Sequence, residues 1–120
     1  MSEEAWEQKR KFYRLKYPKR AMPVIRIKGE QFYVTEVSEQ GLRVIIRGLG
    51  MLYHGLRLAG TIKLHGDNRI DVEGAILRFD DNEVVLQLNK GPSFKDMVQE
   101  QRHIRNKYPS YFSRLRACAA

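Results

Sequence analysis

The chain has 120 residues, a length that fits one domain with a single hydrophobic core. Hydrophobic residues make up 42% of it and charged residues 30%, as in ordinary globular proteins, and no apolar run approaches the ~20 residues that span a membrane. The N-terminus has no apolar stretch of the signal-peptide kind. We therefore expect a cytoplasmic protein with no membrane insertion.

The formal net charge of +8 points to an anionic partner, which is a nucleic acid, a nucleotide or an acidic protein surface. The charge is uneven, because the first twenty residues hold seven lysines and arginines against three glutamates. The single cysteine, Cys118, has no partner for an intramolecular disulfide. The basic N-terminal end is therefore the first place to look for function.

A short helix is expected over residues 2–8, followed by a basic and aromatic arm. Residues 9–14 hold four cations and two aromatics without an apolar period, so they need not be buried. Within them, Arg10 and Arg14 form the pattern R-x-x-x-R, which lets both guanidinium groups reach one object from a helix or an extended strand. Such groups suit phosphate oxygens and the O6 and N7 atoms of guanine. Taken alone, the pattern equally fits a solvated basic leader.

Alternating apolar residues predict six short strands after the arm. In the second of them, we expect Phe32 and Val34 on one face and Val37 on the opposite face. Turn residues separate the strands, and the pattern fits an antiparallel barrel or a sandwich. The predicted strands cover residues 24–28, 31–38, 42–47, 58–64, 70–79 and 83–89.

Two segments depart from simple alternation. After Gly74 the phase slips, because Leu77 and Phe79 also look buried, and a bulge or a bend at Gly74 is expected. The glycine-rich stretch 48–57 is predicted to be a loop, with part of the apolar run 51–53 packed on the body of the protein.

The last segment has a helical pattern. Lys90-Gly91-Pro92 ends the sixth strand, and Ser93 is expected to cap a helix. Pro109 interrupts this helix, and residues 110–116 are expected to form a further turn. The amphipathic helix is expected to pack on an open mouth of the barrel; the alternative is a docking helix for another protein. Its apolar stripe consists of Phe94, Met97, Val98, Ile104 and Tyr108.

A second polar motif lies at Glu36-Val37-Ser38-Glu39-Gln40-Gly41, between the second and third predicted strands. Glu36 and Ser38 are two residues apart, so their side chains share a face of a strand. Gly41 permits unusual backbone angles and a close approach by a ligand. An ordinary hairpin loop with a polar tip is the alternative when this motif is taken alone.

No enzyme site emerges from the sequence. His54, His65 and His103 do not have the spacing of metal ligands, no serine or cysteine lies in a nucleophile motif, and there is no Walker loop. We therefore predict a binding protein without a metal or a cofactor.

Taken together and in this order, the two motifs resemble those of the PilZ domain family. In that family R-x-x-x-R is followed, after a first strand, by [Asp/Asn]-x-Ser-x-x-Gly. Arg10 and Arg14 match the first motif, and Ser38 and Gly41 match the second. Glu36 stands where the family has aspartate or asparagine, so the carboxylate is kept one methylene further out.

The resemblance runs from Lys9 to the C-terminal helix and implies a mainly β fold. This fold is a six-stranded antiparallel Greek-key barrel with a basic N-terminal arm and a C-terminal α-helix. The arm is expected at residues 1–20, the barrel at 21–92 and the helical segment at 93–116, with 9–116 forming one PilZ domain.

The resemblance also implies that the chain binds cyclic di-GMP and works as a ligand-switched adaptor with a protein partner. Arg10 and Arg14 are expected to meet phosphate or guanine, and Glu36 or Ser38 to accept hydrogen bonds from guanine N1 and N2. The arm is expected to become ordered when the ligand binds. The expected ligand-binding residues are Lys9, Arg10, Lys11, Arg14, Glu36, Ser38, Gly41 and Arg78.

Two alternatives stay open. Because Glu36 departs from the family pattern, the chain is alternatively a degenerate PilZ module that binds proteins and no nucleotide. The other alternative is a basic nucleic-acid-binding barrel, which is disfavoured because the strand aromatics form no evident stacking platform.

Overall fold

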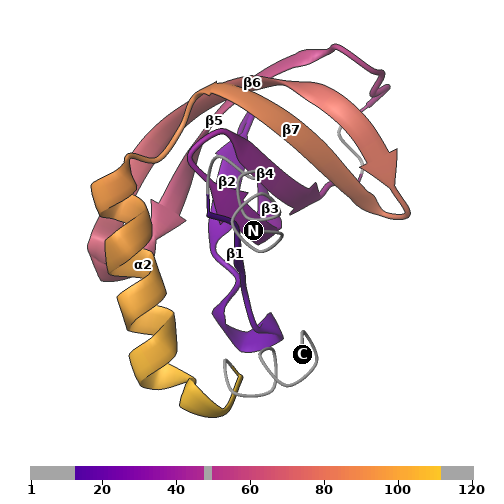
Figure 1. Ribbon diagram of the computed structural model, residues 1–120. Coiled ribbons are helices and arrows are strands. Elements are labelled where there is room, and N and C mark those ends of the chain that lie inside the picture. The colour runs from indigo at the N-terminus through magenta and orange to yellow at the C-terminus, as the bar shows by residue number, and fades with distance from the viewer. Residues whose placement is uncertain (1–12, 48–49, 112–120) are drawn as a thin grey trace, which may run out of the picture.

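The computed structural model describes residues 13–47 and 50–111, and within them the chain is mainly β with one long helix (Figure 1). Helix α2 spans Phe94–Lys107, and two short 3₁₀ helices, η1 and η2, span Lys19–Ala21 and His65–Asp67. The strands are β1 (Leu15–Lys16), β2 (Val24–Ile27), β3 (Glu30–Ser38), β4 (Gly41–Ile45), β5 (Arg57–Leu64), β6 (Asn68–Asp80) and β7 (Glu83–Lys90).

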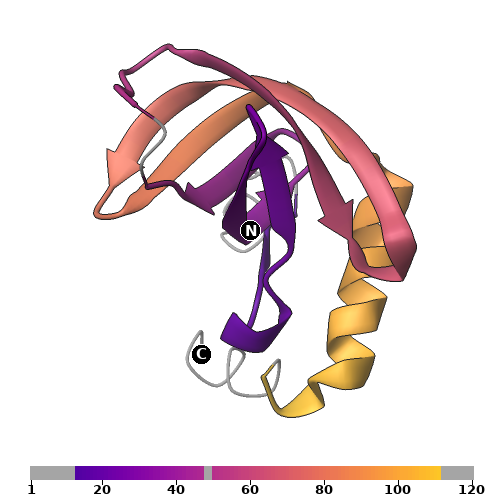
Figure 2. The same cartoon turned by 180° about the vertical axis from the view of Figure 1, so that it is seen from behind.

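Six of these strands close into an antiparallel barrel. Their order around the barrel is β3-β2-β5-β6-β7-β4, and β4 pairs again with β3 to complete the ring (Figures 1 and 2). The segment between β4 and β5 carries the chain across the barrel, so that β5 pairs with β2 instead of β4. The two-residue strand β1 lies outside this ring and pairs with β3. The predicted six-stranded Greek-key barrel is confirmed.

The barrel interior holds the core. Alternate residues of the strands point inward, as the period of two requires, and among the fully buried ones are Ile25, Val34, Val44, Ile62 and Ile76. Burying side chains of this size provides the main favourable free energy of folding. None of the described helices is both long and apolar enough to span a membrane.

Helix α2 begins where the sequence predicts. Ser93 Oγ accepts a hydrogen bond from the backbone N–H of Asp96 at 3.1 Å, and the Asp96 carboxylate accepts one from the backbone N–H of Ser93 at 2.9 Å. This reciprocal capping box satisfies two N–H groups that would otherwise lack partners. Met97 and Ile104 belong to the same core cluster as the barrel residues, and Tyr108 packs against it. Phe94, expected in the buried stripe, is 71% exposed, so that part of the prediction is wrong.

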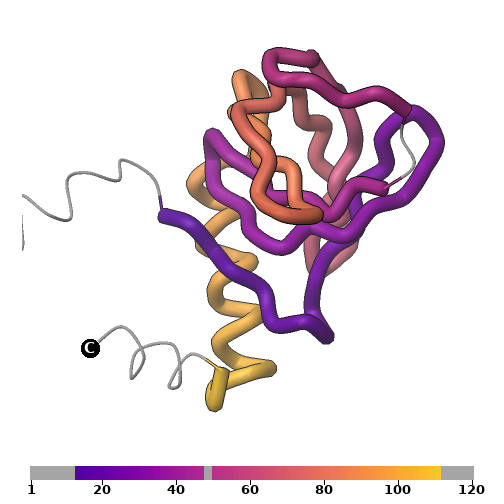
Figure 3. Tube along the Cα trace, turned by 90° about the vertical axis from the view of Figure 1, so that its right-hand side faces the viewer, coloured from indigo at the N-terminus to yellow at the C-terminus, as the bar shows by residue number. Residues whose placement is uncertain are grey.

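The helix and the segment from β1 to η1 lie together at one end of the barrel. Figure 3 shows the chain from residue 13 to the start of β2 crossing beside α2 below the closed ring. Leu15, Tyr17 and Ala21 of this segment are buried in the same cluster as Ile104. The helix therefore packs against the barrel and against the chain that leads out of the predicted arm.

A bulge in β3 overturns one prediction about its faces. The pairing with β4 shifts between Val34 and Glu36, so Thr35 is an extra residue and the alternation changes phase there. As a result, Val37 points into the core with Phe32 and Val34, contrary to the expected opposite face.

Strand β6 is irregular at two places along β7. The pairing shifts between Glu73 and Gly74, where the extra residue is Asn89 of β7, and again between Ile76 and Arg78. An irregularity thus lies at Gly74 as expected, but the alternation of β6 does not slip there, because Val72, Gly74 and Ile76 are all buried. Leu77 is the extra residue of the second shift. Leu77 is 41% exposed and Phe79 is 47% exposed, so the expectation that both are buried is wrong.

The crossing segment between β4 and β5 packs in part on the core, which includes Ile46 and is contacted by Leu56. Leu52 packs against the core cluster, as expected for part of this loop, whereas Met51 and Tyr53 are exposed. The backbone N–H of Gly55 donates to the carbonyl of Ile76 at 2.8 Å and ties the loop to β6.

Candidate ligand-binding site

A pocket of about 310 Å³ lies on the outside of the barrel, where β3 turns into β4. Its lining comes from four places in the chain: residues 14, 36–43, 77–78 and 85–87. The residues that line it are Arg14, Glu36, Val37, Ser38, Gln40, Gly41, Leu42, Arg43, Leu77, Arg78, Val85, Leu86 and Gln87.

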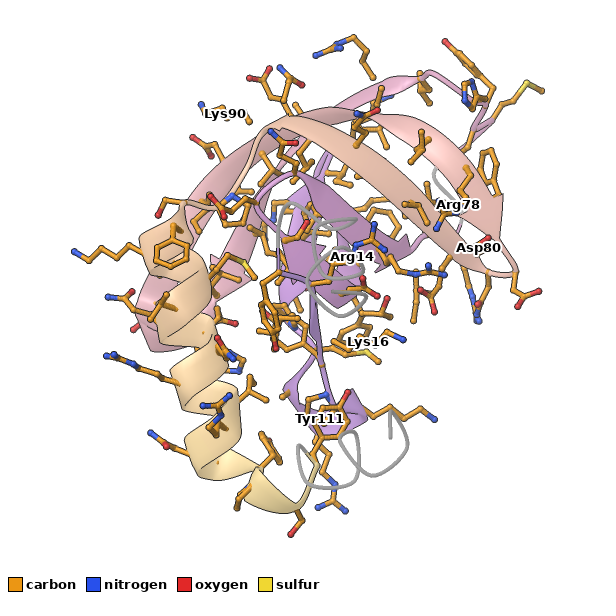
Figure 4. The ribbon with its side chains drawn as sticks, in the orientation of Figure 1. Arg14, Lys16, Arg78, Asp80, Lys90 and Tyr111 are labelled. Carbon is orange, nitrogen blue, oxygen red and sulfur yellow. The ribbon has the colours of Figure 1, made fainter. Side chains whose placement is uncertain are left out.

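The pocket brings together five of the residues predicted from the sequence. They are Arg14, Glu36, Ser38, Gly41 and Arg78. Figure 4 shows Arg14 and Arg78 on the same part of the barrel surface, although they are far apart in the sequence. The other three predicted residues, Lys9, Arg10 and Lys11, lie outside the described residues.

The bulge in β3 places the two polar residues of the turn. Beyond the phase change at Thr35, both Glu36 and Ser38 point away from the core toward the pocket, and both are mostly buried by their neighbours. Ser38 Oγ donates to the carbonyl of Gly41 across the turn at 3.4 Å. A Cβ atom at Gly41 would lie only 3.2 Å from Ser38 Oγ. The absence of a side chain at Gly41 therefore leaves room beside the Ser38 hydroxyl.

Strand β1 brings Arg14 to the pocket. Leu15 pairs with Val37 and Lys16 with Glu36, so the residue before β1 arrives beside the β3 turn. Arg14 Nε lies 4.0 Å from Glu36 Oε1, and the Arg14 side chain is 47% exposed. A weak ion pair of this kind leaves most of the guanidinium available for a ligand.

Arg43 forms part of the opposite wall and is held by two carboxylates. Its Nε atom donates to Glu83 Oε1 at 3.0 Å, and its Nη2 atom donates to Asp80 Oδ2 at 2.9 Å. Asp80 Oδ2 also accepts a hydrogen bond from Arg78 Nε at 3.3 Å. The charge-assisted bonds from Arg78 and Arg43 outweigh desolvation and lower the pKa of Asp80. Asp80 therefore stays ionised at neutral pH and holds two pocket arginines.

The sequence prediction missed Arg43 as a pocket residue. Its position two residues after Gly41, on the same face of β4, is the signal that points to the pocket. Among the described residues, three arginines and one glutamate line the pocket, and Arg43 and Arg78 are also paired with the carboxylates of Asp80 and Glu83 just outside it. The guanidinium groups suit an anion, which can compete with these partly exposed carboxylates.

No group of three potential metal ligands is found in the described part of the chain. The chemistry that the pocket offers is therefore recognition by guanidinium, hydroxyl, carboxylate and amide groups.

The sequence model of the PilZ domain family matches residues 8–106. The chain therefore belongs to the PilZ domain family, as the two motifs had indicated. This family is one of binding and adaptor modules. A search of curated proteins finds no match.

Solved structures share the fold. The Bacillus subtilis inhibitor of motility, MotI/DgrA, is 18% identical with a TM-score of 0.62, over 82% of this chain and 51% of that one. This chain thus spans about half the length of MotI/DgrA. The PilZ domain of YcgR from Escherichia coli, solved with c-di-GMP, is 15% identical with a TM-score of 0.59, over 94% and 100%. An uncharacterised Legionella protein is 18% identical with a TM-score of 0.50, over 88% and 95%. At these identities the likeness concerns the fold alone.

Proposed function

We propose that this chain is a receptor for cyclic di-GMP that acts as a ligand-switched adaptor. The observation that carries the proposal is the pocket at the β3–β4 turn, where Arg14, Glu36 and Ser38 converge in the positions of the two family motifs. The YcgR domain of the same fold was solved with this ligand.

The chemistry of the lining fits a cyclic dinucleotide. Such a ligand carries two phosphate charges, and guanidinium groups pair with phosphate or with the acceptor edge of guanine. Arginine cannot accept a hydrogen bond, so the N1 and N2 donors of guanine need Glu36 or Ser38. Arg78, whose side chain is half exposed, is placed to stack on a purine face or to meet phosphate.

The arm completes the site in this proposal. The pocket is at the small end of the ~300–1,000 Å³ range of ligand sites, so a dinucleotide extends beyond it. Arg10 lies four residues before Arg14, and we propose that it closes over the exposed side of the ligand. Lys9 and Lys11 then strengthen the positive field that attracts the two phosphates.

Calorimetric titration with cyclic di-GMP tests this function, with GTP and cyclic AMP as control ligands. Arg14→Ala and Arg10→Ala should each weaken binding by about 10- to 100-fold, because each removes a charge-assisted contact of ~1.5–3 kcal/mol. Arg26→Ala is the matched control, since Arg26 is an exposed β2 arginine outside the pocket lining. No binding by the wild-type protein at high micromolar ligand would overturn the proposal. Binding that survives both pocket substitutions would keep the receptor and exclude this site.

A protein-binding module that takes no nucleotide is the second candidate. It is favoured by the position of Glu36, whose longer side chain reaches to 4.0 Å from Arg14 Nε and can compete with a phosphate for that arginine. In that case the wild type would show no cyclic di-GMP binding, and Glu36→Asp, which withdraws the carboxylate from Arg14, should make binding detectable.

A further inference from the structure

A buried carboxylate joins three distant parts of the fold. Glu100, in the middle of α2, is only 2% exposed. Its Oε2 atom accepts a 2.5 Å hydrogen bond from the Tyr17 hydroxyl, and its Oε1 atom accepts a 2.8 Å bond from the backbone N–H of His65. His65 Nδ1 also lies 3.1 Å from Oε2. Glu100 thus links the segment after β1, the turn that holds η2, and α2.

The hydrogen bond from the Tyr17 hydroxyl to Glu100 is stable at physiological pH. Tyr17 is itself buried, and burial together with the Glu100 charge raises the pKa of its hydroxyl far above the usual value. The hydroxyl therefore remains a donor throughout the physiological range. A buried carboxylate that loses a donor pays a desolvation penalty, so separation of Tyr17 from Glu100 is unfavourable.

Tyr17 directly follows the strand that presents Arg14. Strand β1 has only two residues, and it pairs with β3 along one edge. Its continuation is held by the bond from the Tyr17 N–H to the Thr35 carbonyl at 3.0 Å. From the side of α2, the Tyr111 hydroxyl donates to the Lys16 carbonyl at 3.2 Å. Both residues are labelled in Figure 4. The position of Arg14 therefore depends on contacts with the C-terminal segment.

We propose that Tyr17 and Glu100 are positioning residues for the ligand pocket, and that they couple its occupancy to the docking of α2. With the hydrogen bond in place, β1 stays beside β3 and Arg14 stays at the pocket. A ligand that binds Arg14 stabilises the same arrangement, and so stabilises the contact with α2. Coupling between two sites is reciprocal. If the ligand raises the equilibrium constant for docking of α2 by some factor, undocking of α2 must lower the affinity for the ligand by the same factor.

The coupling rests on the proposed function, and its size can be bounded. Loss of a hydrogen bond to a charged group shifts an equilibrium by a factor of roughly 10 to 100. The apparent affinity for the ligand falls only in proportion to the fraction of molecules that keep Arg14 at the pocket. Since β1 keeps its backbone bonds to β3, we expect Tyr17→Phe to weaken cyclic di-GMP binding by about 3- to 30-fold. Tyr53→Phe is the matched control, because Tyr53 is exposed in the crossing loop and does not line the pocket.

Two measurements test the inference. Titrations with cyclic di-GMP compare Tyr17→Phe, Glu100→Ala and the double variant, and the double variant should bind no more weakly than Glu100→Ala, because Glu100→Ala already removes the acceptor of the Tyr17 hydroxyl. Amide hydrogen exchange follows residues 15–17 and 100–107 with and without cyclic di-GMP. The ligand should slow exchange in α2 of the wild type and have little effect there in Tyr17→Phe. Without ligand, Tyr17→Phe should speed exchange at residues 15–17.

The possible failures are distinguishable. If the wild type binds no cyclic di-GMP, the proposed function fails. Amide exchange at residues 15–17 without ligand, compared between the wild type and Tyr17→Phe, then still shows whether Tyr17 holds β1 beside β3. Unchanged exchange there in Tyr17→Phe overturns the positioning role. Faster exchange there with unchanged affinity overturns the coupling to the pocket, as does an equal loss of affinity in Tyr53→Phe.

Discussion

The attachment of α2 to the barrel should depend on Ile104 and hardly at all on Phe94. Ile104 is 0% exposed and belongs to the core cluster, so Ile104→Ala removes buried methyl and methylene groups and leaves a cavity. Substitutions of this kind cost about 2–5 kcal/mol of the free energy of unfolding. For a domain of this length, each kcal/mol lowers Tm by about 3–6 °C, so a loss of roughly 6–30 °C is expected.

Phe94 provides the matched comparison on the same helix. It is the larger side chain and it follows the helical apolar period, but it is 71% exposed. Phe94→Ala therefore removes little buried surface and should change the free energy of unfolding by no more than ~0.5 kcal/mol. Both positions belong to α2, so the comparison separates burial from the apolar pattern of the sequence.

Urea denaturation followed by circular dichroism measures both variants against the wild type. The midpoint should fall strongly for Ile104→Ala and stay within error for Phe94→Ala, with similar m values in all three proteins. Equal losses in the two variants would refute the reasoning, because they would mean that Phe94 is buried in solution. An unchanged midpoint for Ile104→Ala would mean that α2 contributes nothing to the core.

Three further outcomes are expected. Gly74→Ala should cost roughly 1–3 kcal/mol or prevent folding, because its Cβ would lie 2.3 Å from the carbonyl oxygen of Gln87; an unchanged urea midpoint would contradict this. Burial lowers the pKa of His103 from 6.5, so the folded state binds that proton more weakly than the unfolded state. Stability should therefore fall as the pH drops below about 6.5, and the fall should be smaller in His103→Gln, measured by urea titrations above and below that pH. Glu36→Asp withdraws the carboxylate from Arg14 and should strengthen cyclic di-GMP binding by about 2- to 5-fold in calorimetry, since an ion pair with a 4.0 Å separation and a half-exposed arginine is weak. Weaker binding would show that Glu36 itself contacts the ligand.

The strand pattern of the barrel was predictable because it is local. Alternation in segments such as 58–64 and 83–89 places apolar residues inward with a period of two, and the structure has β5 and β7 there. The helix start was predictable for the same reason, since Ser93 and Asp96 make the capping contacts within one turn. Closure into a barrel was not contained in this pattern and came from the family resemblance.

Bulges limited what alternation can predict. One extra residue at Thr35 reverses the faces of the rest of β3, which buries Val37 and turns Glu36 outward. The extra residue Leu77 shifts β6 in the same way. A bulge is fixed by pairing with the neighbouring strand, so the sequence of one strand does not reveal where the faces exchange.

Contacts between distant residues were also beyond the sequence. Glu100 is buried because Tyr17, 83 residues earlier, and His65 supply its donors, and nothing near Glu100 in the sequence indicates this. The ion pairs of Arg43 were not predictable for a similar reason, because Asp80 and Glu83 lie far along the chain. In both cases the partner is determined by the barrel topology and not by local spacing.

The ion pairs around Arg43 explain how one surface can be both formed in advance and responsive to a ligand. Without Asp80 and Glu83, the pocket arginines would repel one another and spread into solvent, and the lining would need to reorganise on binding. These carboxylates are partly exposed, so their hold on the arginines is weak and is screened by salt. A phosphate can therefore draw Arg78 or Arg43 away from Asp80 at small cost. The released Asp80 lies at the β6–β7 turn, so, if the chain binds cyclic di-GMP as proposed, binding would change the charge of this part of the surface.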